Sequence, residues 1–204
     1  ALTDVMGDFV EAVKASSEVL AIKGRIFPST CESVHVVADL ADGRVVSGER
    51  EIAAAGGAVR RLRLSETSCR PLPETLEAIA SADLIVLGPG SLFTSVIPNL
   101  LVPGVAEAIA AAPAPVLYIC NCMTQHGETD GFTVEDHLRS LVEHAPLAVP
   151  DVVVANAHPI SEALRARYLE EGAVQVRLGF GASGALPLAG EREVLVPAAT
   201  GRTT

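Results

Sequence analysis

The sequence predicts an α/β fold built on a parallel sheet. Three short apolar runs, Leu84–Leu87, Val116–Cys120 and Val152–Ala155, each lead into a polar loop and then into a helical pattern. Unbroken apolar runs of this length are typical of strands buried on both faces of a parallel sheet. A repeated strand–helix–strand order implies right-handed crossovers, which place the polar loops at one carboxyl edge. We therefore expect helices to flank the sheet and a ligand crevice at that edge.

Composition supports a folded chain with an aliphatic core. Of the 204 residues 49% are hydrophobic and only 3% aromatic, with a mean hydropathy of +0.38. The formal net charge is −10 without a run of Lys or Arg, so duplex nucleic acid and anionic membranes are poor candidate partners. No apolar run approaches the roughly 20 residues of a membrane span. We expect a cytoplasmic protein that can still bind a phosphorylated small molecule.

A small antiparallel excursion is expected around residues 34–64, before the first parallel strand. Val34–Leu40 and Arg44–Glu49 flank an Asp-Gly turn, which is a hairpin signal, and Val59–Leu64 has the alternation of a half-exposed strand. The Ala/Gly-rich residues 51–58 between them indicate no element. The apolar spacing of residues 2–22 predicts a helix that precedes this unit.

Helices are predicted before, between and after the parallel strands, over residues 71–82, 105–112, 133–144 and 162–171. Thr133 is the expected N-cap of the third, with Asp136 at position N3. Ser161 caps the fourth, and Gly172 closes it. Residues 174–178 are a candidate for a last strand, and residues 179–204 are expected to form an irregular tail.

The turn after the first parallel strand is the first candidate ligand segment. Gly88-Pro89-Gly90-Ser91 is followed by Thr94 and Ser95, so three hydroxyls lie beside backbone amides at the sheet edge. Such a turn can hold a phosphorylated ligand. The segment lacks the P-loop lysine and the G-x-G-x-x-G spacing, and a tight turn before a capped helix is the alternative.

The loop after the second strand, Asn121–Gly131, is too polar and too long to be only a connector. Glu128 or Asp130 could hold Mg²⁺ or act as a base, and Asn121 and Gln125 could read a nucleobase or a sugar. A solvated loop is the alternative. This loop, the Gly88–Ser95 turn and Asn156–His158 are expected to face one crevice.

The histidines and cysteines give no further site. His137 is expected to be a surface or capping residue, and His35, His126 and His144 to lie at the surface. Cys31, Cys69, Cys120 and Cys122 are expected to be reduced thiols, mostly in the core, because their spacing does not suit a metal.

The run from Asp83 to Leu101, DLIVLGPGSLFTSVIPNLL, resembles the signature of the YvcK/CofD-like family. Cys120–Gln125, Gly127-Glu128-Thr129, Asp136-His137 and Asn156 fit the same pattern in the same order, as does Gly7-Asp8-Phe9. The resemblance implies a modified Rossmann-like fold, of which residues 1–178 would be the C-terminal portion of a single domain. It also implies an N-terminal Gly-rich segment that these residues lack.

The Gly88-Pro89-Gly90-Ser91-Leu92 turn places the chain nearer the YvcK branch, the gluconeogenesis factors, than the transferase branch with its GPSNP-like turn. That branch implies a regulator that binds a UDP-N-acetylglucosamine-type ligand and supports peptidoglycan synthesis, cell shape and growth on gluconeogenic carbon. The family analogy adds Tyr168 and Arg202 as contacts on the uridine side. The expected ligand-binding residues are Gly88, Pro89, Gly90, Ser91, Thr94, Ser95, Asn121, Met123, Thr124, Gln125, Glu128, Thr129, Asn156, Tyr168 and Arg202.

The related transferases supply the alternative function. A 2-phospho-L-lactate transferase-like enzyme would move a phospholactyl-type group from a nucleotide diphosphate to a deazaflavin alcohol. Mg²⁺ would be its cofactor, and Glu128 or Asp130 its candidate metal contacts. A third possibility is an interaction scaffold with a vestigial crevice. In each case we expect a homo-oligomer and no dedicated metal site.

Overall fold

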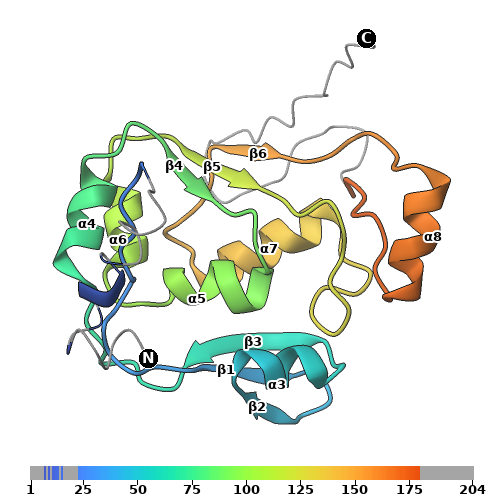
Figure 1. Ribbon diagram of the computed structural model, residues 1–204, viewed down its shortest axis with the longest axis horizontal. Coiled ribbons are helices and arrows are strands. Elements are labelled where there is room, and N and C mark those ends of the chain that lie inside the picture. The colour runs from blue at the N-terminus through green and yellow to red at the C-terminus, as the bar shows by residue number, and fades with distance from the viewer. Residues whose placement is uncertain (1–6, 8, 10, 14, 16–22, 180–204) are drawn as a thin grey trace.

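The computed structural model describes residues 7, 9, 11–13, 15 and 23–179, and arranges them in layers. A parallel sheet forms one layer, helices form the next, and a small antiparallel sheet packs beneath those helices (Figure 1). The predicted α/β class, with a parallel sheet flanked by helices and an antiparallel excursion, is confirmed.

The parallel sheet contains β4 (Ile85–Leu87), β5 (Val116–Ile119) and β6 (Val152–Val154), in that order. Val86 is in register with Leu117, and Leu117 with Val152. The chain passes from β4 to β5 through α5 (Ile97–Leu100) and α6 (Val105–Ala111), and from β5 to β6 through α7 (Val134–His144). The buried face of this sheet and the inner faces of these helices form the main core, which includes the fully buried Leu138 and Leu141.

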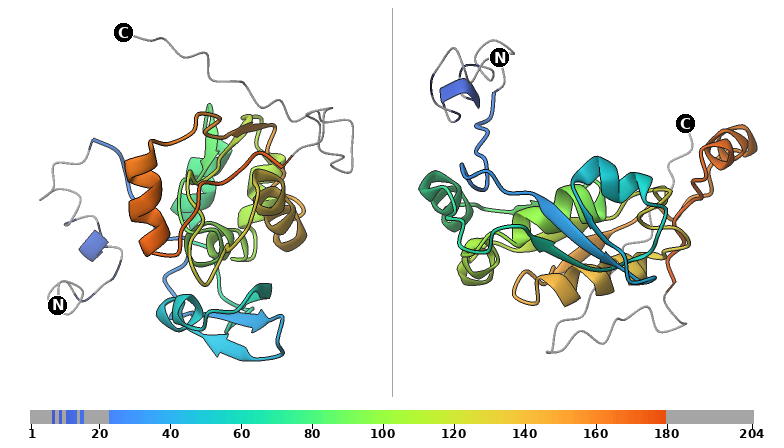
Figure 2. Two further views of the ribbon diagram at one scale, coloured as in Figure 1. Left: turned by 90° about the vertical axis from the view of Figure 1, so that its right-hand side faces the viewer. Right: turned by 90° about the horizontal axis from the view of Figure 1, so that it is seen from below.

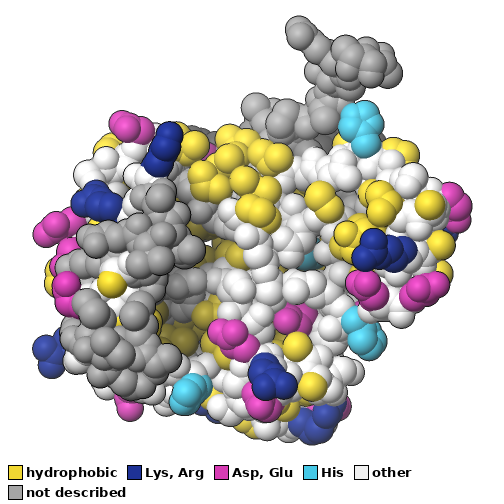
Figure 3. Space-filling view, in the orientation of Figure 1, with side chains coloured by type: hydrophobic (Ala, Val, Ile, Leu, Met, Phe, Trp, Pro, Cys, Tyr) yellow, Lys and Arg dark blue, Asp and Glu magenta, His cyan; other side chains and the backbone are white. Residues whose placement is uncertain are grey.

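The prediction that these strands are buried on both faces is wrong for β4 and for β6. Val86 is 45% exposed and Val154 37% exposed, while Ile85, Leu87 and Val153 are buried. Both crossovers advance in the same direction along the sheet, so right-handed connections place their helices on the same face. The other face is uncovered among the described residues, and hydrophobic side chains gather there over β4 and β5 (Figure 3).

The antiparallel sheet has the order β2-β1-β3, with β1 at Val36–Leu40, β2 at Val45–Ser47 and β3 at Val59–Leu64. The segment that showed no pattern contains α3 (Glu49–Ala54), whose buried residue is Ile52. This helix has two acidic residues in its first turn and alanines at its end, which favour a helix even without a long apolar stripe. The sheet packs under α7 and α5 (Figure 1).

Three more helices belong to the described residues from 23 to 179. The π-helix η1 (Leu92–Val96) follows β4 after the turn at residues 88–91 and buries Leu92 and Phe93, whereas α4 (Pro73–Ala80) precedes β4. The last helix, α8 (Glu162–Glu170), buries none of its residues and lies at the opposite end of the molecule from α4 (Figure 2). π-Helical turns are frequent at functional sites. The position of η1, beyond the carboxyl end of β4, therefore makes this edge of the sheet a candidate site.

The predicted caps agree with the structure. Thr133 and Asp136 form a reciprocal capping box at the start of α7, in which Asp136 Oδ2 accepts from Thr133 N at 2.9 Å. Ser161 Oγ accepts from Leu164 N at the start of α8. Gly172 has a φ of +75° just beyond the C-terminus of α8, as expected for a closing glycine.

The prediction of a last strand at residues 174–178 is wrong. This segment joins no sheet and makes only an isolated antiparallel bridge, between Gln175 and Met123. It runs back along the loop after β5, where Thr124 N donates to Val174 O at 2.8 Å and Val176 N donates to Cys122 O at 3.0 Å. The predicted helix at residues 2–22 falls largely outside the described residues, and the tail from residue 180 onward lies outside them altogether.

In the described part of the chain, no single helix has the length and apolar composition needed to cross a membrane. One bent pair, Leu92–Leu100 with Val105–Ala111, meets the length and composition test only when its two halves are joined across an angle of 71°.

Candidate functional site

A cavity of about 620 Å³ opens at the carboxyl edge of the parallel sheet. Ligand pockets in proteins commonly have this size and this position. The turn after β4, the loop after β5, α3 and the end of α8 border it. The lining residues are Ala53, Pro89, residues 119–126, Glu128, Tyr168, Glu171 and Ala173.

Asn121 joins the turn after β4 to the loop after β5. Its Nδ2 donates to Gly90 O at 2.9 Å, and its Oδ1 accepts from Gly90 N at 3.2 Å. The same Nδ2 lies 3.4 Å from Gln125 Oε1. The side-chain amide therefore pairs with both backbone groups of Gly90, and this pairing fixes the position of the turn relative to the loop.

Ser91, Thr94 and Glu128 form a second link between the same two segments. Ser91 Oγ donates to Glu128 Oε2 at 2.5 Å, and Thr94 Oγ1 donates to Ser91 Oγ at 2.6 Å. Thr94 Oγ1 also lies 3.4 Å from Glu128 Oε1. Glu128 is only 5% exposed. The hydroxyls that were expected to face a phosphate are thus directed at a carboxylate of the chain itself.

The loop after β5 is a packed structure rather than a solvated connector. Thr124 and Thr129 are both almost fully buried. Thr129 Oγ1 accepts from Gln125 N at 2.9 Å, and Thr124 Oγ1 accepts from Val174 N at 2.9 Å. One hydroxyl therefore closes the loop on itself, and the other attaches it to the segment that follows α8.

Gly127 brings this loop against α3 of the antiparallel unit. A Cβ at Gly127 would lie 2.4 Å from Ala53 O, and the residue has a φ of +84°. Only glycine fits such a close approach at a positive φ. The antiparallel excursion thus forms part of the cavity wall, through Ala53.

The end of α8 forms the opposite wall. Tyr168 lines the cavity from this helix, and a Cβ at Gly172 would lie 3.1 Å from the ring of His126. Ala173 N donates to Tyr168 O at 2.9 Å as the helix ends. The predicted uridine-side residue Tyr168 is therefore brought to the same cavity as the loop.

The charge of this cavity is acidic. Glu128 and Glu171 line it, and His126 is the only basic side chain that does so among the described residues. Arg165 and Arg177 line an adjoining cavity of about 530 Å³, and the two cavities share Met123 and Ala173. An anionic ligand would find cationic partners only on that adjoining side.

Burial keeps the thiol at the cavity floor protonated. It raises the pKa of Cys120 to about 12, and burial likewise raises the pKa of Tyr118 on the same strand. All four cysteines are reduced thiols, but only Cys69 and Cys120 are buried. The expectation that they lie mostly in the core therefore holds for two and is wrong for the exposed Cys31 and Cys122.

The acidic residues suggested as Mg²⁺ contacts, Glu128 and Asp130, bond to groups of the chain itself. Asp130 Oδ2 accepts from Gly127 N at 2.7 Å, and Asp130 Oδ1 lies 3.2 Å from His126 Nδ1. The oxygens of Glu128 face Ser91 and Thr94. Among the described residues, no group of three or more His, Cys, Asp or Glu side chains could hold a metal ion.

Two histidines lie elsewhere than predicted. His137 is fully buried, because it falls on the inner face of α7, where its ring packs edge-on against Phe132. Its Nδ1 lies 2.8 Å from Thr133 O, its Nε2 has no hydrogen-bond partner, and burial lowers its pKa. His144 is half-buried and accepts from Leu62 N of β3 at 2.8 Å, which links α7 to the antiparallel sheet. His35 and His126 are exposed as expected.

The structure brings together only part of the predicted site. The predicted residues that line the cavity are Pro89, Asn121, Met123, Thr124, Gln125, Glu128 and Tyr168. Those that do not line it but belong to the adjoining turn or loop are Gly88, Gly90, Ser91, Thr94, Ser95 and Thr129. Asn156 lines none of the three described cavities, and its Oδ1 accepts from His158 N. Arg202 lies outside the described residues.

Sequence reasoning missed several lining residues, namely Ala53, Ile119, Cys120, Cys122, His126, Glu171 and Ala173. The position of His126 within the polar loop was a usable signal, because Gln125 and Glu128, which flank it in the loop, were predicted. Ala53 had no signal, since its role depends on how the antiparallel unit packs against Gly127.

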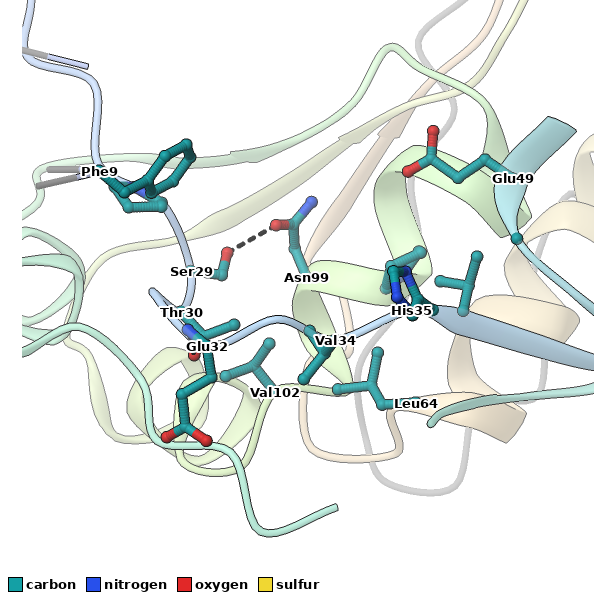
Figure 4. A pocket seen from close by; sticks show the side chains of 14 residues that line it. Phe9, Ser29, Thr30, Glu32, Val34, His35, Glu49, Leu64, Asn99 and Val102 are labelled. Carbon is teal, nitrogen blue, oxygen red and sulfur yellow. Dashed lines mark hydrogen bonds between the residues drawn. The ribbon is translucent and has the colours of Figure 1, made fainter. Parts of the chain in front are cut away.

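A third cavity, of about 480 Å³, lies between the antiparallel sheet, residues 28–36 and α5. Ser29 Oγ donates to Asn99 Oδ1 at 2.6 Å across it (Figure 4). The carboxylates of Glu32 and Glu49 point in opposite directions, and Val34, Val102 and Leu64 lie close together between them (Figure 4). None of the predicted ligand residues lines this cavity.

Comparison with known proteins places the chain in a family. Residues 1–188 match the profile described as 2-phospho-L-lactate transferase CofD. The chain belongs to this family. Among CofD-family relatives, it is 43% identical over 175 residues to a gluconeogenesis factor of Halalkalibacterium halodurans, and 43% identical over 173 residues to that of Bacillus subtilis. The predicted membership in the YvcK/CofD-like family is confirmed.

A solved CofD-family structure has the same fold. The crystal structure of protein BH3568 from Bacillus halodurans matches with a TM-score of 0.83 at 43% identity, and the match covers 86% of this chain and 57% of that one. The two gluconeogenesis factors are matched over 86% and 85% of this chain, but over only 54% and 55% of their own lengths. The chain thus spans about half the length of the relatives it matches.

Proposed function

We propose that this chain is the ligand-binding part of a regulatory protein that binds a UDP-N-acetylglucosamine-type nucleotide sugar. In this proposal, binding adjusts cell-wall synthesis, cell shape and growth on gluconeogenic carbon sources. Relatives named gluconeogenesis factor, matched over at least 85% of this chain, support the physiological part. The cavity at the carboxyl edge supports the ligand part.

The single observation that carries the proposal is the juxtaposition of Tyr168 with the loop after β5 in one cavity. An aromatic ring can stack on a nucleobase, and such stacking contributes about 1–3 kcal/mol. Gln125 uses its Oε1 toward Asn121, so its Nε2 amide can still donate to a base carbonyl. A uracil between Tyr168 and Gln125 would use both groups.

The diphosphate would lie toward the adjoining cavity. Glu128 and Glu171 disfavour an anion in the main cavity, whereas Arg165 and Arg177 offer guanidinium groups beyond Met123 and Ala173. Glu162 also lines that cavity, with its Oε2 3.6 Å from Arg165 Nη1, so the two arginines leave a formal charge of +1 there in favour of a diphosphate.

Calorimetry with UDP-N-acetylglucosamine tests this function. We expect saturable heat for the wild type and binding about tenfold weaker for Tyr168→Ala, the loss expected for one stacked base. Arg167→Ala, on the same helix but lining neither cavity, is the matched control and should bind like the wild type. Absence of heat with the wild type, or equal losses in both variants, would contradict the proposal.

A transferase of the 2-phospho-L-lactate type is the second candidate, because the matching family profile carries that description. It ranks second because Glu128 and Asp130 bond to groups of the chain itself. Mass spectrometry of a deazaflavin alcohol incubated with an activated phospholactyl nucleotide and Mg²⁺ tests it. A transferred product whose formation is abolished in the Glu128→Ala/Asp130→Ala double variant would establish this candidate over the first.

A further inference from the structure

The side-chain hydrogen bonds around Glu128 form a chain in which each hydroxyl donates toward the carboxylate. Thr94 Oγ1 donates to Ser91 Oγ, and Ser91 Oγ donates to Glu128 Oε2. We propose that this cluster is an acceptor-only subsite, in which Glu128 accepts hydrogen bonds from a vicinal diol of the ligand. The inference rests on the proposed function only where it takes the whole ligand to be a nucleotide sugar, and the binding of a diol by Glu128 is argued from the cluster itself.

A count of the hydrogens leads to the acceptor-only character. Each hydroxyl has one hydrogen, and a carboxylate has none. The Ser91 hydrogen is committed to Glu128 at 2.5 Å, and the Thr94 hydrogen to Ser91 at 2.6 Å. What remains for a ligand is a set of oxygen lone pairs. Such a surface accepts hydrogen bonds and offers none.

The three residues divide into one contact residue and two positioning residues. Glu128 lines the cavity, whereas Ser91 and Thr94 do not line it. The two hydroxyls approach different oxygens of the carboxylate, Oε2 and Oε1, and so fix its plane. Because Glu128 is only 5% exposed, the carboxylate meets a ligand in a partly desolvated setting, where each hydrogen bond discriminates more strongly.

The chemistry of the subsite selects the ligand class. A phosphate would bring further acceptors toward a carboxylate, without a donor between them, and would be repelled. For a divalent cation the subsite offers one carboxylate, one oxygen of which already accepts from Ser91, and among the described residues no group of three or more His, Cys, Asp or Glu side chains could hold a metal ion. A vicinal diol supplies two donors that a carboxylate can accept together. The ribose and the hexose of a nucleotide sugar both carry such a diol.

Methyl NMR of protein labelled at the threonine methyl groups tests the inference, with the Thr94 signal assigned through Thr94→Ser. Uridine and methyl β-D-glucopyranoside are the diol probes, and they separate the ribose source from the hexose source. We expect at least one of them to shift the Thr94 signal saturably. For uridine, 2′,3′-dideoxyuridine should then bind about tenfold more weakly, because it lacks the diol.

Three variants sharpen the result. Glu128→Gln should remove the preference for the diol, so that the two nucleosides bind alike, whereas Glu171→Gln, at the other acidic residue of the cavity, should keep it. Ser91→Ala retains the carboxylate and should reduce the preference for the diol by a smaller factor than Glu128→Gln does. If Ser91 had only a structural role, its replacement would leave this preference unchanged.

Several outcomes would overturn the inference. They are a shift of the Thr94 signal by inorganic phosphate but by neither diol, its broadening by Mn²⁺ at stoichiometric concentration, or no response to either diol probe. The wild-type titrations decide these outcomes, and the only variant they need is Thr94→Ser, which assigns the signal. They also do not use UDP-N-acetylglucosamine, so a failure of the proposed function in calorimetry is a separate result.

Discussion

The turn after β4 and the loop after β5 occupy equivalent places at the ends of neighbouring parallel strands, yet they contribute differently to the cavity. Residues 88–96 hold the glycine- and hydroxyl-rich signature but supply only Pro89 to the cavity wall. Residues 121–131 supply Asn121 through His126 and Glu128. The signature segment therefore acts mainly as a support that positions the loop, and the loop forms the contact surface.

The largest effect on this arrangement is expected from Gly127→Ala in the loop. The new Cβ would lie 2.4 Å from Ala53 O, a backbone atom, at a φ of +84°. We expect the free energy of unfolding to fall by about 2–4 kcal/mol, since both the steric overlap and the positive φ oppose the substitution. Denaturant unfolding of the purified protein measures this loss.

Gly131→Ala is the matched control for that prediction. Gly131 lies in the same loop with a φ of +75°, but a Cβ there would meet no atom within 4 Å. A loss of about 1 kcal/mol is expected from the positive φ alone. Equal losses at the two positions would mean that the contact between the loop and α3 does not stabilise the protein.

Asn121→Asp should have the next largest effect, because it separates the turn from the loop. Its side chain would place an acceptor where Nδ2 now donates to Gly90 O at 2.9 Å. We expect a loss of about 2 kcal/mol in unfolding free energy. Asn156→Asp is the control: Asn156 Oδ1 only accepts, from His158 N, and aspartate can do the same, so a change within about 0.5 kcal/mol is expected. If the two substitutions lowered the unfolding free energy by similar amounts, the hydrogen bonds between Asn121 and Gly90 would not be what joins the turn to the loop.

A smaller effect is expected in the supporting turn. Ser91→Ala removes the hydroxyl that donates to Glu128 at 2.5 Å and leaves the carboxylate with Thr94 alone. We expect a loss of about 1 kcal/mol, measured by the same unfolding experiment. Ser95→Ala, four residues further on at an exposed position, should change stability by less than about 0.5 kcal/mol. A larger loss at Ser95 than at Ser91 would show that the cluster does not link the turn to the loop.

Much of the fold could be predicted, because periodicity and capping are local properties. The parallel strands, the Asp-Gly hairpin and the Thr133 capping box follow from residues close in sequence. The exposed face of β4 could not be predicted in this way, since an apolar run gives no information about which face a crossover covers. The failed strand at residues 174–178 has a similar cause: Thr124 holds Val174 beside the loop through two hydrogen bonds.

The sequence predicted which segments border the candidate site, but it did not predict what each side chain does there. Tyr168 and the loop after β5 do meet in one cavity, as the family resemblance implied. The direction of the Ser91 and Thr94 hydroxyls could not be predicted, because it depends on where Glu128 lies after folding. Clustered hydroxyls at a sheet edge are compatible with a phosphate and also with a carboxylate of the same chain.

Low pH should destabilise the protein next to the loop after β5, through His137 in the first turns of α7. Burial lowers the pKa of His137 below its usual value of 6.5, and its ring packs against Phe132 at the end of the loop. The folded state therefore holds the neutral ring, while the unfolded chain binds a proton as the pH falls below about 6.5. The stability contributed by the neutral ring is present above that pH and is lost as the pH falls toward the pKa of the folded state.

Unfolding free energies at pH 7.5 and 5.0 should thus differ less for His137→Gln than for the wild type. An equal difference in both proteins would assign the acid sensitivity to other groups.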